Sequence, residues 1–184
     1  VPEQVGRRHQ VLDLGLDARG YVLFLARLVP EKQCHTLIEA WMSLEDKSDL
    51  KLVIAGPIWH SAEYAASLKE QAKGDPSVLF LGEVAFADLP SIYAAADLMA
   101  IASDYESFCF AAIEAMASGL VTVAFDYAAG QKLIRHGETG FLVPFGDEGA
   151  FLAQVDAALA HWQNGAMRTA ARKAVEPLAW SDIV

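Results

Sequence analysis

The hydrophobic positions of this sequence fall into short continuous runs separated by segments with helical spacing. Apart from Lys51 and Thr122, the runs are continuously apolar instead of alternating with polar residues, which is typical of parallel strands covered on both faces of a sheet. Their alternation with helical segments predicts successive βαβ units, and therefore an α/β fold with a doubly wound, mainly parallel, six-stranded sheet. The expected strands are residues 21–26, 50–56, 78–82, 98–102, 120–125 and 140–144.

The segments between the runs carry apolar stripes with the period of a helix. A further helix is expected around residues 89–96, starting near Asp88. Turns are expected at residues 74–76 and 137–140, where glycines interrupt the pattern. The two clearest stripes consist of Leu37, Ile38, Trp41 and Leu44, and of Phe151, Leu152, Val155, Leu159 and Trp162.

The length and composition of the chain favour one globular domain. It has 184 residues, of which 54% are hydrophobic, so residues 1–184 are expected to form a single buried core. Residues 1–20 are interpreted as an approach segment. The chain stops at residues 180–184 without an obvious final strand, and both ends are therefore expected to be cut from a longer protein.

The charge of the chain excludes some partners. The formal net charge is −10, which repels nucleic acids and anionic lipid headgroups at long range, although a few local cations can still bind a phosphorylated small molecule. The two cysteines and five scattered histidines predict neither a disulfide framework nor a metal site, and they favour a reducing cytoplasm. No apolar stretch is long enough to span a bilayer and no signal-peptide pattern is present.

Two acids stand out where the fourth expected strand gives way to a loop and a helix. Glu114 has apolar neighbours on both sides in the sequence, so a buried carboxylate there must meet a polar group. That group is either a neighbouring backbone or arginine, or the hydroxyls of a ligand. Glu106 lies in the preceding loop near the start of the helix, where anions are favoured. Alone, Glu106 would be interpreted as a solvated loop acid.

Two cations follow the first expected strand directly. Arg27 and Lys32 lie where the carboxyl end of a strand opens into the crevice of a doubly wound sheet, and two positive charges there suit a diphosphate. The alternative is that one of them only pairs with Glu31 at the surface.

Together these residues resemble family 4 glycosyltransferases. Glu106 and Glu114 are similar to the E-x7-E signature of that family, and Arg27 with Lys32 resembles its G-R-x4-K-G phosphate motif. The segment 136–144 also resembles the family, and the similarity covers roughly residues 21–174. The resemblance implies a Rossmann-like domain, one half of a GT-B enzyme, that binds the nucleotide sugar while an absent N-terminal domain binds the acceptor.

In that family the sugar is transferred from a nucleoside diphosphate with retention of configuration and without a metal or other cofactor. The resemblance implies that Arg27 and Lys32 contact the diphosphate, that Glu106 lies near the transferred sugar, and that Glu114 contacts the ribose. It gives Arg27, Lys32 and Glu106 the catalytic roles and implies that the isolated domain is inactive. The residues that it implies for nucleotide-sugar binding are Arg27, Lys32, Gly82, Val84, Glu106, Ser107, Phe108, Cys109, Phe110 and Glu114.

The segment 126–129 is similar to that of members that glycosylate lipids or polysaccharides at the inner membrane face, which favours peripheral membrane association of a full-length enzyme. Ala26, Gln33 and Cys109 stand where the family usually has glycine, and residues 128–132 lack a common acid. These departures indicate weakened donor affinity, an unusual donor, or a sequence altered for folding.

One rival hypothesis is therefore a non-catalytic or engineered nucleotide-binding or interaction domain on the same scaffold. An NAD-dependent enzyme is disfavoured, because no G-x-G-x-x-G follows the first expected strand.

Overall fold

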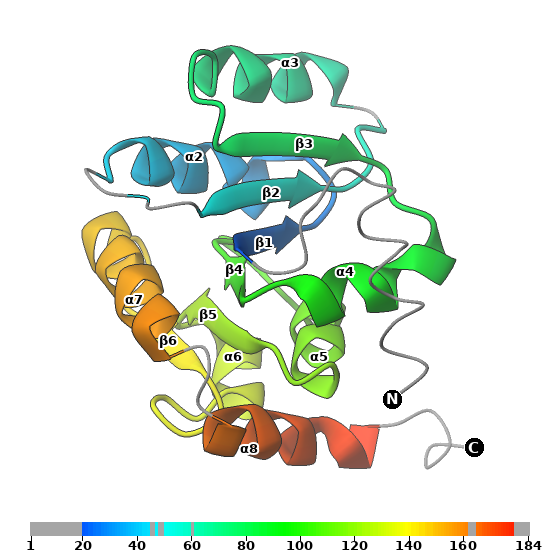
Figure 1. The fold of residues 1–184 in the computed structure, drawn as a ribbon, viewed down its shortest axis with the longest axis vertical. Helices are drawn as coiled ribbons and strands as arrows, with labels where there is room; N and C mark the ends of the chain where they lie inside the picture. Colours follow the sequence, from blue (N-terminus) through cyan, green and yellow to red (C-terminus); the bar gives the residue numbers. More distant parts are fainter. Residues whose placement is uncertain (1–19, 45–46, 48–49, 60, 162–164, 179–184) are drawn as a thin grey trace.

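A computed structural model of the chain describes residues 20–44, 47, 50–59, 61–161 and 165–178 (Figure 1). The expected approach segment, apart from Gly20, lies outside the described residues. So do Trp162 of the second helical stripe and the chain end at residues 180–184.

All six expected strands are present, and they form one parallel sheet in the order β3-β2-β1-β4-β5-β6. The prediction of a doubly wound α/β fold is confirmed. Each expected strand end is met to within two residues. The strands are β1 (Tyr21–Leu25), β2 (Lys51–Ala55), β3 (Val78–Gly82), β4 (Leu98–Ile101), β5 (Val121–Phe125) and β6 (Phe141–Val143).

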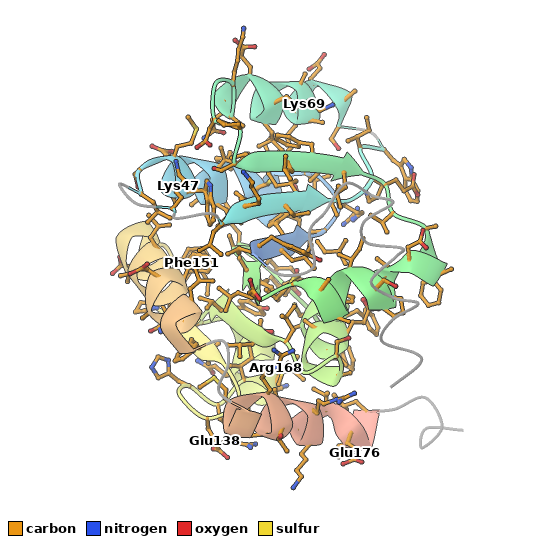
Figure 2. All side chains as sticks on the ribbon, viewed as in Figure 1. Lys47, Lys69, Glu138, Phe151, Arg168 and Glu176 are labelled. Atoms are coloured by element: carbon orange, nitrogen blue, oxygen red, sulfur yellow. The ribbon has the colours of Figure 1, made fainter. Side chains whose placement is uncertain are left out.

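Helices cover both faces of the sheet (Figures 1 and 2). Apolar side chains of α2, α3 and α7, with Met167 of α8, form one core cluster with one face of the strands, and side chains of α4, α5 and the rest of α8 form the other cluster. β1 contributes side chains to both clusters: Val22 and Phe24 belong to the first cluster, and Tyr21 and Leu23 belong to the second. The helices are η1 (Pro30–Lys32), α2 (Cys34–Met42), α3 (Ala62–Gln71), η2 (Phe86–Asp88), α4 (Leu89–Ala95), α5 (Phe110–Ala117), α6 (Ala128–Leu133), α7 (Glu148–His161), α8 (Gly165–Val175) and η3 (Glu176–Leu178).

The helical stripes agree with the structure except at one end. α2 ends at Met42, so Leu44 lies beyond it, although Leu44 still packs against the first core cluster. α4 starts immediately after Asp88, as the pattern predicted.

The order of the strands places β1 beside β4, and this is the point where the chain reverses its direction of travel across the sheet. Loops after the carboxyl ends of these two strands border the crevice in which doubly wound sheets bind ligands. The ends of β1 and β2 pack closely against each other. A Cβ atom at Gly56, just after β2, would lie 1.7 Å from the carbonyl oxygen of Ala26, just after β1. Only glycine fits at that position.

Candidate functional site

Two of the predicted site residues meet at the switch point of the sheet. Lys32 ends η1 after β1, and Glu106 lies in the loop between β4 and α5. The Nζ atom of Lys32 donates to Oε1 of Glu106 at 2.6 Å, and the Ser103 hydroxyl donates to the same oxygen at 2.9 Å. Their side chains are only 15% and 16% exposed. The ion pair is therefore a fixed, largely desolvated feature of the crevice.

Arg27 behaves differently from Lys32. It directly follows the last residues of the β1 run and is exposed, and it makes no ion pair within the described part of the chain. The alternative that Arg27 or Lys32 pairs with Glu31 is wrong for the described residues, because Lys32 pairs with Glu106 instead.

Glu114 meets the polar partner that its apolar surroundings required. Tyr93, on α4, donates its hydroxyl to Oε2 of Glu114 at 2.8 Å. Tyr93 is 2% exposed, and burial, followed by the adjacent Glu114 carboxylate, raises the pKa of Tyr93 far above its ordinary value. The tyrosine therefore remains a proton donor. No sequence pattern singles out Tyr93 as this partner, because it lies on a different helix.

Cys109 lies between the two acids. Burial raises the pKa of its thiol, the Glu106 carboxylate acts in the same direction, and Lys32 opposes it. The buried Tyr127 hydroxyl has no well-formed hydrogen bond within the described residues. It lies beside this thiol, and burial first and the thiol second raise the pKa of Tyr127. Both groups therefore stay protonated at neutral pH.

The backbone is strained on both sides of the ion pair. Gln33 and Cys109 have φ angles of 53° and 54°, and they are the non-glycine residues with left-handed φ among those described. They are also the residues that precede α2 and α5. The left-handed turn itself explains why the family usually has glycine at these two positions. No left-handed φ occurs at Ala26.

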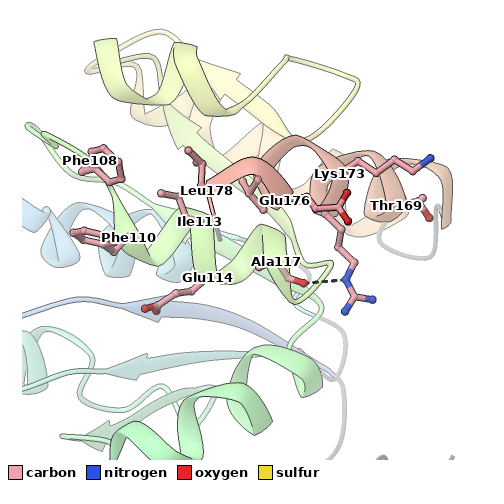
Figure 3. A pocket seen from close by; sticks show the side chains of 11 residues that line it. Phe108, Phe110, Ile113, Glu114, Ala117, Thr169, Lys173, Glu176 and Leu178 are labelled. Atoms are coloured by element: carbon pink, nitrogen blue, oxygen red, sulfur yellow. Dashed lines mark hydrogen bonds between the residues drawn. The ribbon is translucent and has the colours of Figure 1, made fainter. Parts of the chain in front are cut away.

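An apolar groove of about 800 Å³ runs between α5 and α8 (Figure 3). The exposed rings of Phe108 and Phe110 lie at one end of it, with their centroids 5.1 Å apart, and Glu114 lines its edge. At the other end the guanidinium of Arg172 donates to the carbonyl of Ala117 at 2.9 Å. The groove was not predicted, since it depends on how α8 packs against α5.

Gly82 and Val84 lie at the end of β3, one strand beyond β2. The carbonyl of Gly82 accepts a hydrogen bond from the amide of Gly56 at 2.7 Å, which holds the two strand ends together. Beside it, the indole N–H of Trp59 donates to the Glu83 carboxylate at 3.2 Å. Val84 is half-buried, and Ser107, at the other predicted loop, is exposed.

No group of three or more histidine, cysteine or acidic side chains gathers within metal-binding distance in the described residues. In the same part of the chain, every helix is too short or too polar to cross a bilayer.

The six parallel strands, their order and the charged loops at the switch point define an α/β domain of the Rossmann-like type found in GT-B glycosyltransferases. The chain belongs to the family of glycosyl transferases group 1, whose profile matches residues 13–175.

Several relatives are glycosyltransferases by name. A GDP-mannose-dependent alpha-mannosyltransferase of Mycolicibacterium smegmatis is 32% identical over 166 residues, covering 89% of this chain and 40% of that protein. A mannosylfructose-phosphate synthase of Agrobacterium fabrum is 38% identical over 136 residues, covering 69% of this chain and 30% of that one. The crystal structure of Anabaena Alr3699/HepE with UDP has a TM-score of 0.80 at 25% identity, covering 97% of this chain and 49% of that chain. The chain thus spans less than half of these proteins.

Proposed function

We propose that this chain is the donor-binding domain of a retaining glycosyltransferase that transfers a sugar from a nucleoside diphosphate to a lipid, saccharide or other acceptor. The observation that carries the proposal is the Lys32–Glu106 ion pair at the switch point of the sheet, between β1 and the start of α5. A cation and a helix N-terminus at one place stabilise the negative charge that develops on a leaving diphosphate.

The roles follow from the chemistry of the transfer. The bond between the anomeric carbon and the diphosphate oxygen breaks, and the electron pair stays on the diphosphate, where Lys32 and Arg27 oppose the growing negative charge. No described side chain caps the first turn of α5, so backbone amides near Phe108 and Phe110 remain candidates for contacts with the donor. Glu106 would lie near the sugar and Glu114 near the ribose hydroxyls.

The acceptor would be held by a second domain, because the chain spans less than half of its relatives. The relatives named for GDP-mannose and solved with UDP support a nucleotide-sugar donor. Both cysteines are buried free thiols, which agrees with a reducing cytoplasm. Metal independence, the absence of a cofactor and peripheral membrane association of a full-length enzyme stay predictions.

The experiment is a calorimetric titration of the chain with UDP, GDP and NAD. We expect binding of a nucleoside diphosphate, no binding of NAD, and a loss of at least about tenfold in affinity in both Arg27→Ala and Lys32→Ala. Lys69→Ala, on the exposed side of α3, removes an equal charge away from the crevice and should bind as the wild type does.

Two results would contradict the proposal. Unchanged affinity in both Arg27→Ala and Lys32→Ala would place the nucleotide elsewhere. Failure of the wild type to bind any of the three compounds would favour the rival hypothesis of a non-catalytic interaction domain.

A further inference from the structure

Gln33 occupies a backbone conformation that its side chain does not favour. Its φ and ψ angles are 53° and 33°, in the left-handed region where a Cβ atom meets steric crowding. The position is held there by backbone hydrogen bonds on both sides, from its own N–H to the carbonyl of Pro30 at 2.9 Å and from the N–H of Leu37 to its carbonyl at 3.2 Å. A glycine would adopt this turn without strain.

The side chain of Gln33 makes two contacts that a glycine cannot make. Its Nε2 atom donates to Oδ2 of Asp104, in the loop that carries Glu106. Its Oε1 atom accepts a hydrogen bond from the hydroxyl of Thr36 at 2.7 Å, and Thr36 is buried in the first turn of α2. The oxygen of the Gln33 amide is therefore held by α2, and its nitrogen is bound to the loop between β4 and α5.

Three links join the segment after β1 to the segment after β4. Besides the contact of Gln33 with Asp104, the N–H of Asp104 donates to the carbonyl of Glu31 at 3.0 Å, and Lys32 pairs with Glu106 at 2.6 Å. All three lie within residues 31–33 on one side and 104–106 on the other. The Gln33–Asp104 contact is exposed to solvent, so it orders the two loops without contributing to the core.

We infer that Gln33 is a positioning residue: its side chain clamps the β4–α5 loop to the β1–α2 turn and so keeps Glu106 in reach of Lys32. If the proposed function holds, the clamp orders the donor site before the nucleotide sugar binds. This consequence rests on the proposed function. An ordered site loses less conformational freedom on binding and therefore binds more tightly.

The test separates the clamp from the stability of the fold. Gln33→Gly removes the side-chain links and also the left-handed strain, so its melting temperature should equal or exceed that of the wild type. We expect the amide hydrogen of Asp104 to exchange at least about tenfold faster, because its protection depends on the clamp. The affinity for UDP or GDP should fall about tenfold, because the released loop must then be ordered when the nucleotide binds.

Two further variants make the assignment specific. Gln33→Asn tolerates the left-handed backbone but is one methylene shorter, so it should lose the contact with Asp104 and behave as Gln33→Gly does. Asp104→Ala removes the other half of the contact. In the double variant Gln33→Gly with Asp104→Ala, the affinity should fall no further than in Asp104→Ala alone, because both changes remove one interaction.

The outcomes separate this inference from the proposed function. Unchanged exchange at Asp104 in Gln33→Gly overturns the inference, whatever the nucleotide does. Faster exchange with unchanged affinity, in a wild type that binds the nucleotide, also overturns it. If the wild type binds no nucleotide, the proposed function fails by itself, and the donor-ordering role fails with it.

Discussion

Replacing Tyr93 with phenylalanine tests whether Glu114 is held as a charged, oriented carboxylate. The change removes one hydroxyl group that is 2.8 Å from Oε2 of Glu114 and leaves the buried ring in place. Because burial and the neighbouring carboxylate both raise the pKa of Tyr93, the hydroxyl is protonated at neutral pH. The variant therefore removes a donor and changes no charge.

The size of the effect follows from the surroundings of the pair. A hydrogen bond to a charged group contributes about 1.5 to 3 kcal/mol. Glu114 is half-buried and lines an open groove, so water can replace part of the lost bond, and we expect a loss of about 1 to 1.5 kcal/mol in the free energy of unfolding. For a domain of this size, that lowers the melting temperature by about 2 to 6 °C. The affinity for the nucleoside diphosphate should fall by about three- to tenfold, since the carboxylate is less ordered.

Urea unfolding and calorimetric titration measure the two effects on the same sample. Tyr64→Phe is the matched control, because the hydroxyl of Tyr64 on α3 lies 2.7 Å from Nδ1 of His35 and the residue is on the opposite face of the sheet from α4. It should cost about 0.5 to 1 kcal/mol and leave nucleotide affinity unchanged. A Tyr93→Phe variant as stable as the wild type would refute the reasoning, because Glu114 would then not depend on that hydroxyl.

Two further predictions concern stability. Gly56→Ala should cost at least about 3 kcal/mol in urea unfolding or prevent folding, since its Cβ would lie 1.7 Å from the Ala26 carbonyl oxygen, whereas Gly74→Ala, with no atom within 4 Å but a φ of +94°, should cost only about 1 kcal/mol. Equal costs would contradict this. For Asp75, burial would raise the pKa, but hydrogen bonds from Lys47 and a neighbouring serine outweigh it and lower the pKa from 3.8 to about 2. Because the folded-state pKa is the lower one, the stabilisation is complete above about pH 4 and is lost as the pH falls toward 2. Screening near the surface reduces it to about 1 kcal/mol, so the stability difference between wild type and Asp75→Asn should be about that size at pH 7 and vanish near pH 2; a difference independent of pH would refute the assignment.

The strands could be predicted because their chemistry is local. A run such as residues 120–125 is apolar at every position except Thr122, and a short run of this kind is typical of a strand covered on both faces. α8 was not predicted. Its buried residues are Met167, Ala171 and Val175, which are spaced four apart among polar residues and include one small side chain. Ala171 and Val175 are buried in the cluster that contains α5, and Met167 is buried in the other cluster. No local pattern reports these contacts.

The residues of the site also fall into those that the sequence predicts and those that depend on how the helices pack. Lys32 and Glu106 each lie in the loop that follows an apolar run, and parallel strands end at one edge of a sheet, so the sequence placed both at that edge. The partner of Glu114 could not be predicted in this way. The sequence required a polar group there, but Tyr93 lies on another helix, 21 residues earlier, and its selection depends on how α4 packs beside α5.

The two left-handed residues connect the fold to the site. Gln33 and Cys109 precede α2 and α5, the helices that follow the adjacent strands β1 and β4, and neither supplies a side-chain cap to its helix. A non-glycine residue in this conformation costs about 1 to 3 kcal/mol and persists only where its surroundings enforce it. Here both lie within three residues of the Lys32–Glu106 pair. The unfavourable turns leave the starts of both helices without a side-chain cap, so their positive ends can act on an anion in the crevice. A sequence optimised only for stability would have glycine at these two N-cap positions, since glycine adopts the left-handed turn without strain.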